Sequence, residues 1–466
     1  MSLVFYDIET TGISSSFDQI LQFAAIKTDT NFTEVDQLNI RCRLRDHIIP
    51  SPDALRVTGI SVSQLHDPVI PSHYEMIRRI NKKLLSWSPA IFLGFNSLNF
   101  DEHFFRQALY QTLHRPYLTN TNGNARTDVM KMVQAASIFA PDALIVPRDI
   151  HGNTSFRLGP IASANGYVHD QLHDALSDAK ATMFLCRLLS ERTPWLWSTF
   201  MRFSQKAAVI DFIKSESFFC LTDFYFGNPY SWMVTVIGEN QENSSEYYVF
   251  DLSVNPDKLK VLSQDMLRAR VNDSPKPLRR LRVNAAPIIV SAEEAPEICS
   301  AHIVGFDEIS RREHILKSDD ELKNRIIEAF ESTREKRNQS PYVEEQIYDG
   351  FFTIKDETLL NDFQNVEWEK RREILQKFND SRLIELGLRL IYEERPDLLS
   401  ETEHHDIENK FFHRHFPHEG DVFPWLTVQK ALVQLNTLLS STEIENKTNL
   451  EEYRRILLMM TEKSSD

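Results

Sequence analysis

The sequence predicts an α/β domain at the N-terminus, followed by a smaller β-rich region and a helical C-terminal region. Three observations support this order. Strand and helix patterns alternate over about the first 190 residues, short strand patterns separated by turn residues follow, and the last part is charged, poor in glycine and periodic at the helical spacing. A chain of 466 residues is long enough for roughly two to four domains. We place the domains at 1–193, 194–350 and 351–466.

The N-terminal region contains the clearest element patterns. Apolar runs predict strands over four segments, Leu3–Ile8, Gln19–Thr28, Asn39–Leu44 and Ala90–Phe95. Amphipathic spacing predicts helices over three segments, His73–Trp87, Phe100–Leu113 and Asp174–Leu189. Alternation of strands and helices is typical of an α/β domain, and Pro194 interrupts it.

The middle region combines strand patterns with a cluster of cations. Strands are predicted at Phe218–Tyr225, Ser231–Ile237, Tyr247–Leu252 and Ala286–Ser291. Between Met266 and Ser291, six cations accompany the single acid Asp273: Arg268, Arg270, Lys276, Arg279, Arg280 and Arg282. This basic stretch is either one wall of a nucleic-acid groove or an exposed basic loop. From Asp319 onward the pattern is helical, with a hinge expected at 338–341.

Composition excludes several classes of protein. Hydrophobic residues make up 42% and charged residues 26% of the chain, which is ordinary for a globular protein. No apolar run reaches the roughly 18 residues of a membrane helix, and the N-terminus lacks the basic start of a signal peptide. The 4 cysteines form no CxxC pair, so we expect a reduced, cytoplasmic protein without a zinc ribbon. The net charge of −15 is concentrated in the last third, and it affects solubility more than what one groove binds.

The most informative segment is FYDIETTG, residues 5–12. Strand side chains alternate between faces, so Asp7 and Glu9 project from one face and Ile8 from the other. Adjacent carboxylates on a buried strand repel each other, and a divalent cation with oxygen ligands is the usual way to neutralise them. Two solvated acids at the end of a strand are the alternative.

Two further segments carry acids at the starts of helices. GFNSLNFD, residues 94–101, is an apolar strand and a polar turn followed by Asp101, which in isolation suits a helix cap. HDALSD, residues 173–178, contains a histidine and an acid five positions apart, about 140° apart on a continuous helix. For both to serve one site, His173 must precede the helix and Asp178 must lie one turn inside it, with Asp174 as N-cap. A loop histidine and a solvated acid are the alternative.

Together the three segments point to phosphoryl transfer. Four carboxylates can hold two hard cations roughly 3.5–4 Å apart, and such a pair stabilises both the attacking and the leaving oxygen of a phosphodiester displacement. A histidine can take the proton from the attacking water, because its pKa lies near neutral pH. The candidate residues are Asp7, Glu9, Asp101, His173 and Asp178.

The order DxE, NxxFD and HxxxxD resembles the DEDDh superfamily of 3′–5′ exonucleases. Five further segments resemble the bacterial exonuclease I family within it: QFAAIKTD (22–29), TGI (58–60), SFRL (155–158), ANG (164–166) and QIYDGFF (346–352). The likeness extends from Val4 to about Phe352, and more weakly to the end of the chain.

The resemblance implies a fold, an activity and a set of residue roles. The fold is a ribonuclease H-like exonuclease domain with a mixed sheet, a small SH3-like β domain and an α-helical C-terminal domain, forming a clamp over single-stranded DNA. The activity is Mg²⁺-dependent 3′–5′ degradation of single-stranded DNA to nucleoside 5′-monophosphates, in DNA repair and recombination. Two Mg²⁺ ions, for which Mn²⁺ can substitute, bind Asp7, Glu9, Asp101 and Asp178, and His173 is the general base.

The resemblance also implies contacts with the DNA strand and a protein partner. Glu9, Arg157, Phe156, Thr58 and Arg106 contact the substrate, with Arg157 near the scissile end. Core packing is the alternative for Phe156, and a solvated helix face is the alternative for Arg106. The implied partner is the C-terminal tail of the single-stranded-DNA-binding protein, and we expect a monomer that acts in the bacterial cytoplasm without a membrane.

Two other functions remain open at this point. One is RNA trimming by a DEDDh exoribonuclease with extra domains, although RNA trimmers of this superfamily are about one domain long. The other is a non-catalytic nucleic-acid-binding protein, against which the intact set of four acids and one histidine weighs strongly.

Overall fold

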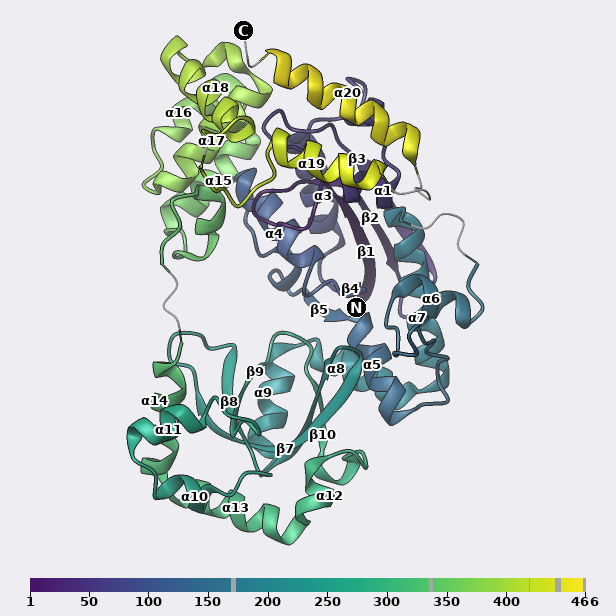
Figure 1. Ribbon diagram of the computed structural model, residues 1–466, viewed down its shortest axis with the longest axis vertical. Coiled ribbons are helices and arrows are strands. Elements are labelled where there is room, and N and C mark those ends of the chain that lie inside the picture. The colour runs from purple at the N-terminus through teal and green to yellow at the C-terminus, as the bar shows by residue number, and fades with distance from the viewer. Residues whose placement is uncertain (169–172, 335–337, 419, 441–445, 464–466) are drawn as a thin grey trace. The chain divides into compact units, whose positions relative to one another are not determined.

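The computed structural model of the protein describes residues 1–168, 173–334, 338–418, 420–440 and 446–463 (Figure 1). The chain forms two compact units. The first unit comprises Met1–Asn124, Asp170–Lys180 and Gln339–Asp466, and the second comprises Ala125–His169 and Ala181–Asn338.

A mixed sheet forms the centre of the first unit. Its strands β1 (Ser2–Thr10), β2 (Ile20–Thr28), β3 (Glu34–Arg41) and β4 (Ala90–Gly94) lie in the order β3-β2-β1-β4. β1 pairs antiparallel with β2 and parallel with β4, and β3 pairs antiparallel with β2. The mixed sheet that we predicted is therefore confirmed, and β1, which carries the DxE motif, is one of its inner strands.

Helices cover one face of this sheet because alternate strand residues are apolar. Tyr6 and Ile8 of β1 are buried in a cluster with Phe23 of β2. The same cluster includes residues from α3 (His73–Trp87) and α4 (Asp101–Gln111). The alternation of β1 therefore sends Tyr6 and Ile8 into this core and places Asp7 and Glu9 on the opposite face.

The C-terminal segment of the first unit is helical, as predicted. It contains a 3₁₀ turn at Val343–Tyr348 and another at Pro396–Leu398. Its helices are α15 (Ile354–Asn365), α16 (Trp368–Leu375), α17 (Ser381–Glu394), α18 (Glu401–His415), α19 (Val428–Leu439) and α20 (Lys447–Lys463). α19 and α20 share a buried apolar cluster with the short helices α1 (Pro52–Thr58) and α2 (Val62–Leu65).

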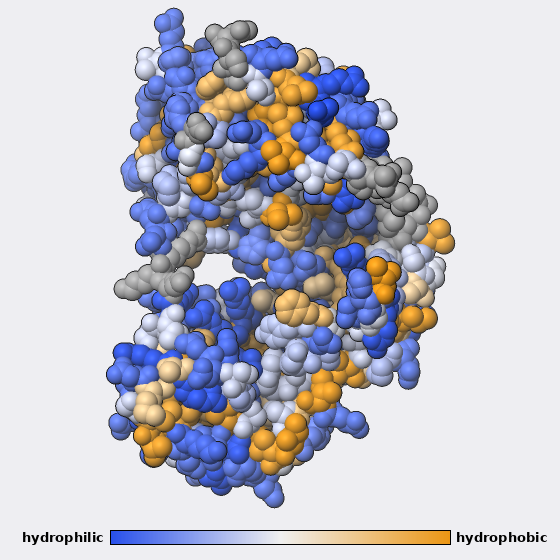
Figure 2. Space-filling view, viewed as in Figure 1, coloured by the Kyte–Doolittle hydropathy of each residue, from blue (hydrophilic) through white to orange (hydrophobic). Residues whose placement is uncertain are grey.

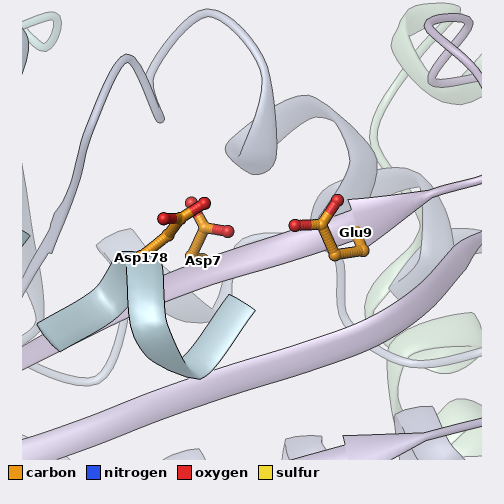
Figure 3. Close-up of side chains that lie close together, drawn as sticks. All are labelled: Asp7, Glu9 and Asp178. Carbon is orange, nitrogen blue, oxygen red and sulfur yellow. The ribbon is translucent and has the colours of Figure 1, made fainter. Parts of the chain in front are cut away.

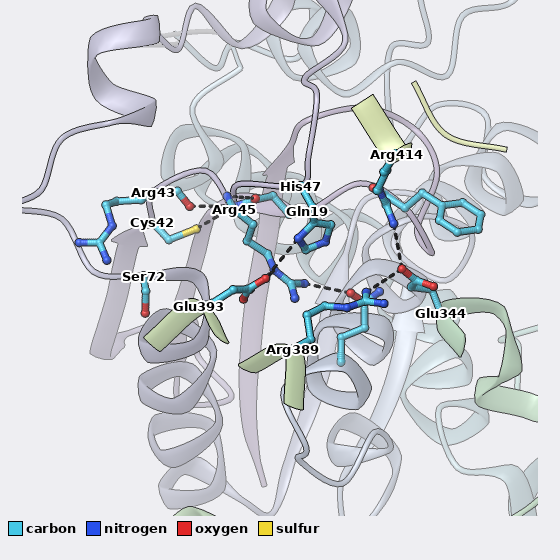
Figure 4. Close-up of polar contacts among 12 residues, drawn as sticks. Gln19, Cys42, Arg43, Arg45, His47, Ser72, Glu344, Arg389, Glu393 and Arg414 are labelled. Atoms are coloured by element: carbon cyan, nitrogen blue, oxygen red, sulfur yellow. Dashed lines mark hydrogen bonds and ion pairs between the residues drawn. The ribbon is translucent and has the colours of Figure 1, made fainter. Parts of the chain in front are cut away.

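Buried ion pairs connect the C-terminal helices to the N-terminal part of this unit, through Arg45 and Glu393, and to one another, through Glu344 (Figure 4). Arg45 Nε lies 3.0 Å from Glu393 Oε1, and its Nη1 donates to Gln111 Oε1 at 3.0 Å. Arg389 and Arg414 both donate to Glu344 Oε1, at 2.7 and 2.9 Å. Burial alone would raise the pKa of Glu344, but the two guanidinium charges outweigh it and lower that pKa to about 2.

The second unit is built on a five-stranded antiparallel sheet. The strand order is β10-β6-β7-β8-β9, with β6 at Phe219–Tyr225, β7 at Asn228–Glu239, β8 at Glu246–Asp251, β9 at Leu278–Arg282 and β10 at Ile288–Ser291. Every pair of neighbours is antiparallel. A small β-rich region was predicted here, and the comparison of this sheet with an SH3 domain stays a prediction.

Helices account for most of the remainder of the second unit. They are α5 (Val129–Phe139), α6 (Leu158–Ala164), α8 (Pro194–Phe203), α9 (Lys206–Ser215), α10 (Pro256–Lys260), α11 (Gln264–Arg270), α12 (Ser300–Val304), α13 (Phe306–Ser318) and α14 (Asp320–Ser332). A short strand, β5 (Ala125–Asp128), begins this unit. α7 (Ala175–Arg192) starts in the first unit and ends in the second.

Some predicted elements differ from the observed ones. The strand expected at Asn39–Leu44 is β3, which starts earlier because its pairing with β2 reaches back to Glu34. Hydrophobicity did not show this start, since the first residues of β3 are exposed. Strands β5 and β9 were not predicted. In β9, three arginines among five residues leave no apolar strand pattern.

The surface and the cysteines agree with the composition. On the face shown in Figure 2, hydrophilic side chains cover most of the surface and apolar side chains form smaller patches. None of the helices that the structure describes is both long and apolar enough to span a membrane. All four cysteines are free and buried.

Candidate active site

Three carboxylates converge on the face of the central sheet opposite the apolar core (Figure 3). Asp7 and Glu9 extend from β1, and Asp178 extends from the first turn of α7. One oxygen from each of the three lies within 4.8 Å of the others. Carboxylate oxygens at this spacing are the ligands that hard divalent cations prefer.

The geometry of β1 explains why two of these acids lie together. Asp7 and Glu9 are two residues apart, so both leave the strand on the same side. In the ladder with β2, Asp7 lies opposite Ala24 and Glu9 lies opposite Gln22. The ladder is irregular just beyond Glu9, where the strand ends.

Capping of α7 places the third acid. Asp174 Oδ1 accepts hydrogen bonds from the backbone N–H groups of Leu176 and Ser177, both at 3.2 Å, which makes Asp174 the N-cap that we predicted. Asp178 follows one turn later, and its N–H donates to the carbonyl of Asp174 at 3.0 Å. The helix thus starts where the hypothesis of a shared site required.

Side chains of β2 and β3 hold the N-cap in place. Gln22 Nε2 donates to Asp174 Oδ2 at 2.9 Å, and Arg41 Nη2 donates to the same oxygen at 3.1 Å. Burial alone would raise the pKa of Asp174, but these bonds and the backbone donors lower it. Asp174 therefore stays ionised and serves as an anchor for the helix.

The three clustered acids have the opposite electrostatics. Burial, reinforced by the charge of Asp101, raises the pKa of Asp7 well above its usual range. Burial and the charge of Asp178 raise the pKa of Glu9 to about 9, and burial raises the pKa of Asp178 to about 6. Carboxylates that repel each other in this way are stabilised by a bound cation. The donor set therefore fits a divalent metal.

Asp101 lies near this cluster but outside its 4.8 Å limit. It is the first residue of α4, it is buried, and its charge contributes to the raised pKa of both Asp7 and Glu9. The structure thus places Asp101 within electrostatic reach of the other acids, and direct coordination by Asp101 stays a prediction.

His173 lies where the sequence hypothesis put it, on the turn directly before α7. Its side chain is exposed and its backbone φ is 59°, in the left-handed region that is uncommon for residues other than glycine. The role of His173 as general base stays a prediction.

Besides Glu9, two predicted DNA contacts belong to the first unit. Thr58 uses its hydroxyl locally, donating to the carbonyl of Ala54 at 2.9 Å. Arg106 is largely buried, with its guanidinium carbon 5.1 Å from the Tyr117 ring centre and its Nη1 donating to Tyr348 Oη at 3.0 Å. The alternative of a solvated helix face for Arg106 is therefore wrong.

The other two predicted DNA contacts, Phe156 and Arg157, belong to the second unit. Phe156 is half-buried, and its ring packs edge-on against Phe224 with centroids 5.3 Å apart. Arg157 is exposed, and no hydrogen bond or ion pair to its guanidinium is found among the described residues. Phe156 thus has a packing role, and contact of either residue with DNA stays a prediction.

Sequence reasoning missed the supporting residues of the site. Gln22 and Arg41 hold the cap of α7, while Glu102 accepts from the buried Tyr6 hydroxyl at 2.9 Å. The sequence contained a signal for the role of Gln22, because this residue is the first of the QFAAI segment and lies opposite Glu9 in the ladder. The sequence contained no signal for the role of Arg41, since a cation on a polar strand is common.

The basic stretch of the second unit is partly regular structure and partly an exposed loop, which contains Lys276. Arg268 and Arg270 lie on α11, and Arg279, Arg280 and Arg282 lie on β9. Arg279 lies 3.7 Å from Asp251, and Arg280 lies within 3.7 Å of both Glu246 and Glu331. These acids come from distant parts of the sequence and compensate much of the local positive charge. A role of the stretch as a groove wall stays a prediction.

Two family models match the chain. The model described as Exonuclease matches residues 4–185, and the model described as Exonuclease I C-terminal domain matches residues 341–460. Exodeoxyribonuclease I of Haemophilus influenzae is 26% identical over 83% of this chain and 84% of its own length. Exodeoxyribonuclease I of Escherichia coli is 26% identical over 76% of this chain and 77% of its own length.

Solved structures give the same result at the level of fold. Exonuclease I from Methylocaldum szegediense superposes with a TM-score of 0.84 at 25% identity, covering 98% of this chain and 99% of that one. Exonuclease I of E. coli, solved with a dA16 oligonucleotide, superposes with a TM-score of 0.85 at 22% identity and covers 99% of both chains.

The fold and the acidic cluster define a metal-dependent exonuclease. Since the two family models together match more than half of the chain, and the relatives are similar over most of their length, the protein belongs to the exonuclease I family.

Proposed function

We propose that this protein is a Mg²⁺-dependent 3′–5′ exonuclease that degrades single-stranded DNA to nucleoside 5′-monophosphates. The observation that carries the proposal is the cluster of Asp7, Glu9 and Asp178, three carboxylates within 4.8 Å on a rigid strand and a capped helix. Relatives named exodeoxyribonuclease I over most of the chain support the choice of DNA as substrate.

Asp7, Glu9 and Asp178, together with Asp101, hold two Mg²⁺ ions. When bound, the ions stabilise the charge that develops on the attacking and leaving oxygens of the phosphodiester. The chain holds the four carboxylates in position. β1 is an inner strand of its sheet, and α7 is anchored through Asp174, so both elements provide a firm support for the metal ligands.

His173 takes the proton from the attacking water. Its exposed position on the turn before α7 leaves its ring accessible to a water next to the substrate. Burial of such a base would favour its neutral form, but it would also block the approach of the DNA end.

Arg157 binds a phosphate near the scissile end, since it is exposed and a guanidinium can hold a phosphate through two parallel hydrogen bonds. Phe156 contacts the strand from beside it. Arg106 and Thr58 contribute in the first unit, Arg106 chiefly through the donors that Tyr348 leaves unused.

The test is cleavage of a 5′-labelled single-stranded DNA oligomer and of an RNA oligomer of the same sequence, in Mg²⁺ or Mn²⁺ and in EDTA. We expect a ladder that shortens from the 3′ end of DNA only, with nucleoside 5′-monophosphate as product. Faster loss of RNA would favour the exoribonuclease alternative. Binding of DNA without metal-dependent cleavage of either oligomer would favour a non-catalytic protein.

We also propose the cellular setting that the family suggests. A solved structure described as SSB/Exonuclease I with an inhibitor supports the C-terminal tail of the single-stranded-DNA-binding protein as a partner. We further propose that the protein acts as a monomer in the cytoplasm, in DNA repair, with functional borders at 1–193, 194–350 and 351–466. Anisotropy of a labelled tail peptide and light scattering test the partner and the oligomeric state.

A further inference from the structure

The turn between β6 and β7 in the second unit places a phenylalanine in an unusual position. Phe226 and Gly227 form the two-residue connection, with φ values of 52° and 76°. A hairpin turn with both central residues at positive φ normally contains asparagine, aspartate or glycine at the first position, because a bulky side chain is strained there. Phe226 is also 99% exposed. Its ring therefore adds nothing to the core while its backbone is strained, which is the pattern expected of a functional residue.

The tip of this hairpin is fixed against a second segment. A Cβ on Gly227 would lie 2.7 Å from the carbonyl oxygen of Thr154, so the turn approaches that backbone as closely as only glycine allows. On the β6 side, Phe224 packs against the Phe156 ring. Asn228 Nδ2 donates to the carbonyl of Phe226 at 3.3 Å. The hairpin tip is thus held in one place relative to residues 154–156.

The second segment is itself well ordered. Asp149 Oδ1 accepts from the backbone N–H groups of His151 and Asn153, at 2.8 and 2.9 Å. Arg148 Nη1 donates to the carbonyl of Gly152 at 2.7 Å. Residues 147–155 therefore form a compact loop that presents its side chains on a stable backbone.

A cavity of about 820 Å³ lies between the hairpin tip and this loop. Its lining includes Phe226 and Asn228 from the hairpin and Arg148 and Arg157 from the loop side, with Asp149 as the one carboxylate. Hydrogen bonding by the backbone N–H of Asn153 is the main cause that lowers the pKa of Asp149, and the charge of Arg157 contributes, so this carboxylate stays ionised. The two guanidinium groups outnumber the one carboxylate and favour an anion, and Phe226 offers a flat aromatic face beside them.

We propose that this cavity is a nucleotide subsite for single-stranded DNA, in which a base stacks on Phe226 and an adjacent phosphate binds Arg157. The inference rests on the proposed function and adds to it a residue from the hairpin. The Arg157 guanidinium is exposed and makes no hydrogen bond or ion pair among the described residues. An exposed aromatic ring next to such a guanidinium suits a polymer of aromatic bases and phosphates better than an apolar peptide or a simple anion.

Further aromatic rings on the hairpin support a strand rather than a single nucleotide. Tyr225 and Tyr230 lie with ring centroids 5.6 Å apart, and Tyr230 stacks on Trp232 at 6.1 Å with an angle of 11°. The two tyrosines are about half exposed. Arg279 lies 3.5 Å above the Trp232 ring, so a cation accompanies this row as well.

The decisive variant is Phe226→Asn, compared with Phe226→Trp. Asparagine suits the turn better than phenylalanine, so it removes the ring without disturbing the hairpin. Binding of a labelled oligo(dT) is measured by anisotropy in EDTA, where no cleavage occurs. We expect about 5- to 100-fold weaker binding for Phe226→Asn, the usual effect of losing one base–aromatic stack, and near wild-type binding for Phe226→Trp. The matched control is Ile303→Ala, an apolar residue of the same unit that is 88% exposed and outside the cavity.

Two further measurements separate a binding role from a structural one. A structural role of Phe226 predicts a lower melting temperature for Phe226→Asn, whereas strain relief predicts an equal or higher one. Oligomers with a single abasic position, moved along the strand, should identify one position at which wild type and Phe226→Asn bind equally. Wild-type affinity of Phe226→Asn for intact DNA, or the same loss at every abasic position, would overturn the proposal. The proposed function fails separately, if wild type binds DNA but does not shorten it in Mg²⁺.

Discussion

Gln22 and Asp174 are joined by a hydrogen bond of 2.9 Å that links the central sheet to the helix carrying Asp178. Gln22 lies opposite Glu9 in the β1–β2 ladder, and Asp174 is the N-cap of α7. This bond, together with the one from Arg41, therefore fixes the position of the acid on α7 relative to the two acids on β1. Gln22 is a positioning residue, because it contacts the cap and not the three clustered oxygens.

Replacing Gln22 should disturb catalysis more than DNA binding. Gln22→Leu keeps the volume of the side chain and removes the donor, so α7 loses one of its two side-chain anchors. We expect the cleavage rate at saturating DNA to fall about 10- to 100-fold, as small misplacements of catalytic groups do, with KM little changed. Gln22→Glu, which cannot donate to Asp174, should not rescue the rate. The control variant Gln37→Leu, changed at an exposed position of β3, should cleave DNA at the wild-type rate. A wild-type rate for Gln22→Leu would show that Gln22 does not position the site.

Neutralising Asp178 should abolish cleavage and stabilise the metal-free protein. Asp178→Asn removes one of three mutually repelling carboxylates, so the melting temperature in EDTA should rise, while the rise caused by Mg²⁺ should shrink. Cleavage should fall by at least about 10³-fold, because the ligand set stabilises charge mainly in the transition state. Calorimetry with and without Mg²⁺ and a gel assay measure both effects. Asp142→Asn, an exposed carboxylate, is the control, and Mg²⁺ stabilising both variants equally would contradict the assignment.

Loss of the His173 ring should slow cleavage without preventing DNA binding. For His173→Ala we expect a rate about 10²–10⁴-fold lower at neutral pH, the usual contribution of a positioned general base. Part of this loss should be recovered as pH rises, because hydroxide becomes more available and can attack without the help of a general base. A rate–pH profile measured at saturating DNA decides the point, with exposed His66→Ala as control. If the rate–pH profile of His173→Ala matches that of wild type in height and shape, His173 is not the general base.

The sequence was sufficient to predict that Asp7, Glu9 and Asp178 lie together, because each position follows from a local rule. Strand alternation put Asp7 and Glu9 on one face, and an aspartate before an apolar periodic segment predicted the start of α7 and hence the place of Asp178. Long amphipathic helices could also be predicted from the local sequence. The helix predicted at His73–Trp87 has those bounds in the structure.

The features that were not predicted depend on residues far apart in the chain. Arg45 and Glu393 form a buried pair although they are 348 positions apart in the sequence. The residues around each of them give no pattern from which the other could be predicted. The arginines of β9 were counted as a positive surface, yet their partners Asp251 and Glu331 lie on other elements. A local charge count cannot include such partners, since only the fold brings them together.

Acid should destabilise the protein through buried histidines. Burial lowers the pKa of His114 to about 3, against about 6.5 in an unfolded chain. Below pH 6.5 the unfolded state therefore binds a proton that the folded state does not, so the free energy of unfolding falls as pH falls. From pH 7 to 5 this one residue contributes a loss of about 2 kcal/mol. Urea unfolding at both values should show a smaller pH dependence for His114→Gln by about that amount, whereas exposed His151→Gln should keep the wild-type dependence.

Glu344 should be the most costly acid to neutralise outside the active site. It accepts hydrogen bonds from both Arg389 and Arg414 in a buried position, so Glu344→Gln leaves two guanidinium groups without their counter-charge. Removing one partner of a buried ion pair costs about 3–5 kcal/mol of unfolding free energy. The control is Glu385→Gln on the same α17 helix as Arg389, where the carboxylate is half exposed and lies 3.6 Å from Lys410. A surface pair of this kind contributes at most about 1 kcal/mol.

The pH dependence of the Glu344 effect provides an independent check. Because the folded pKa of Glu344 is lowered to about 2, its ionised form stabilises the protein above the unfolded value of about 4.3, and this contribution is lost as pH falls toward 2. The difference between wild type and Glu344→Gln should therefore be constant from pH 7 to 5 and shrink by pH 3. Chemical unfolding at these three values measures it. A difference that stays the same at pH 3 would mean that Glu344→Gln acts through packing, and that the carboxylate charge does not hold the 3₁₀ turn at Val343–Tyr348 to α17 and α18.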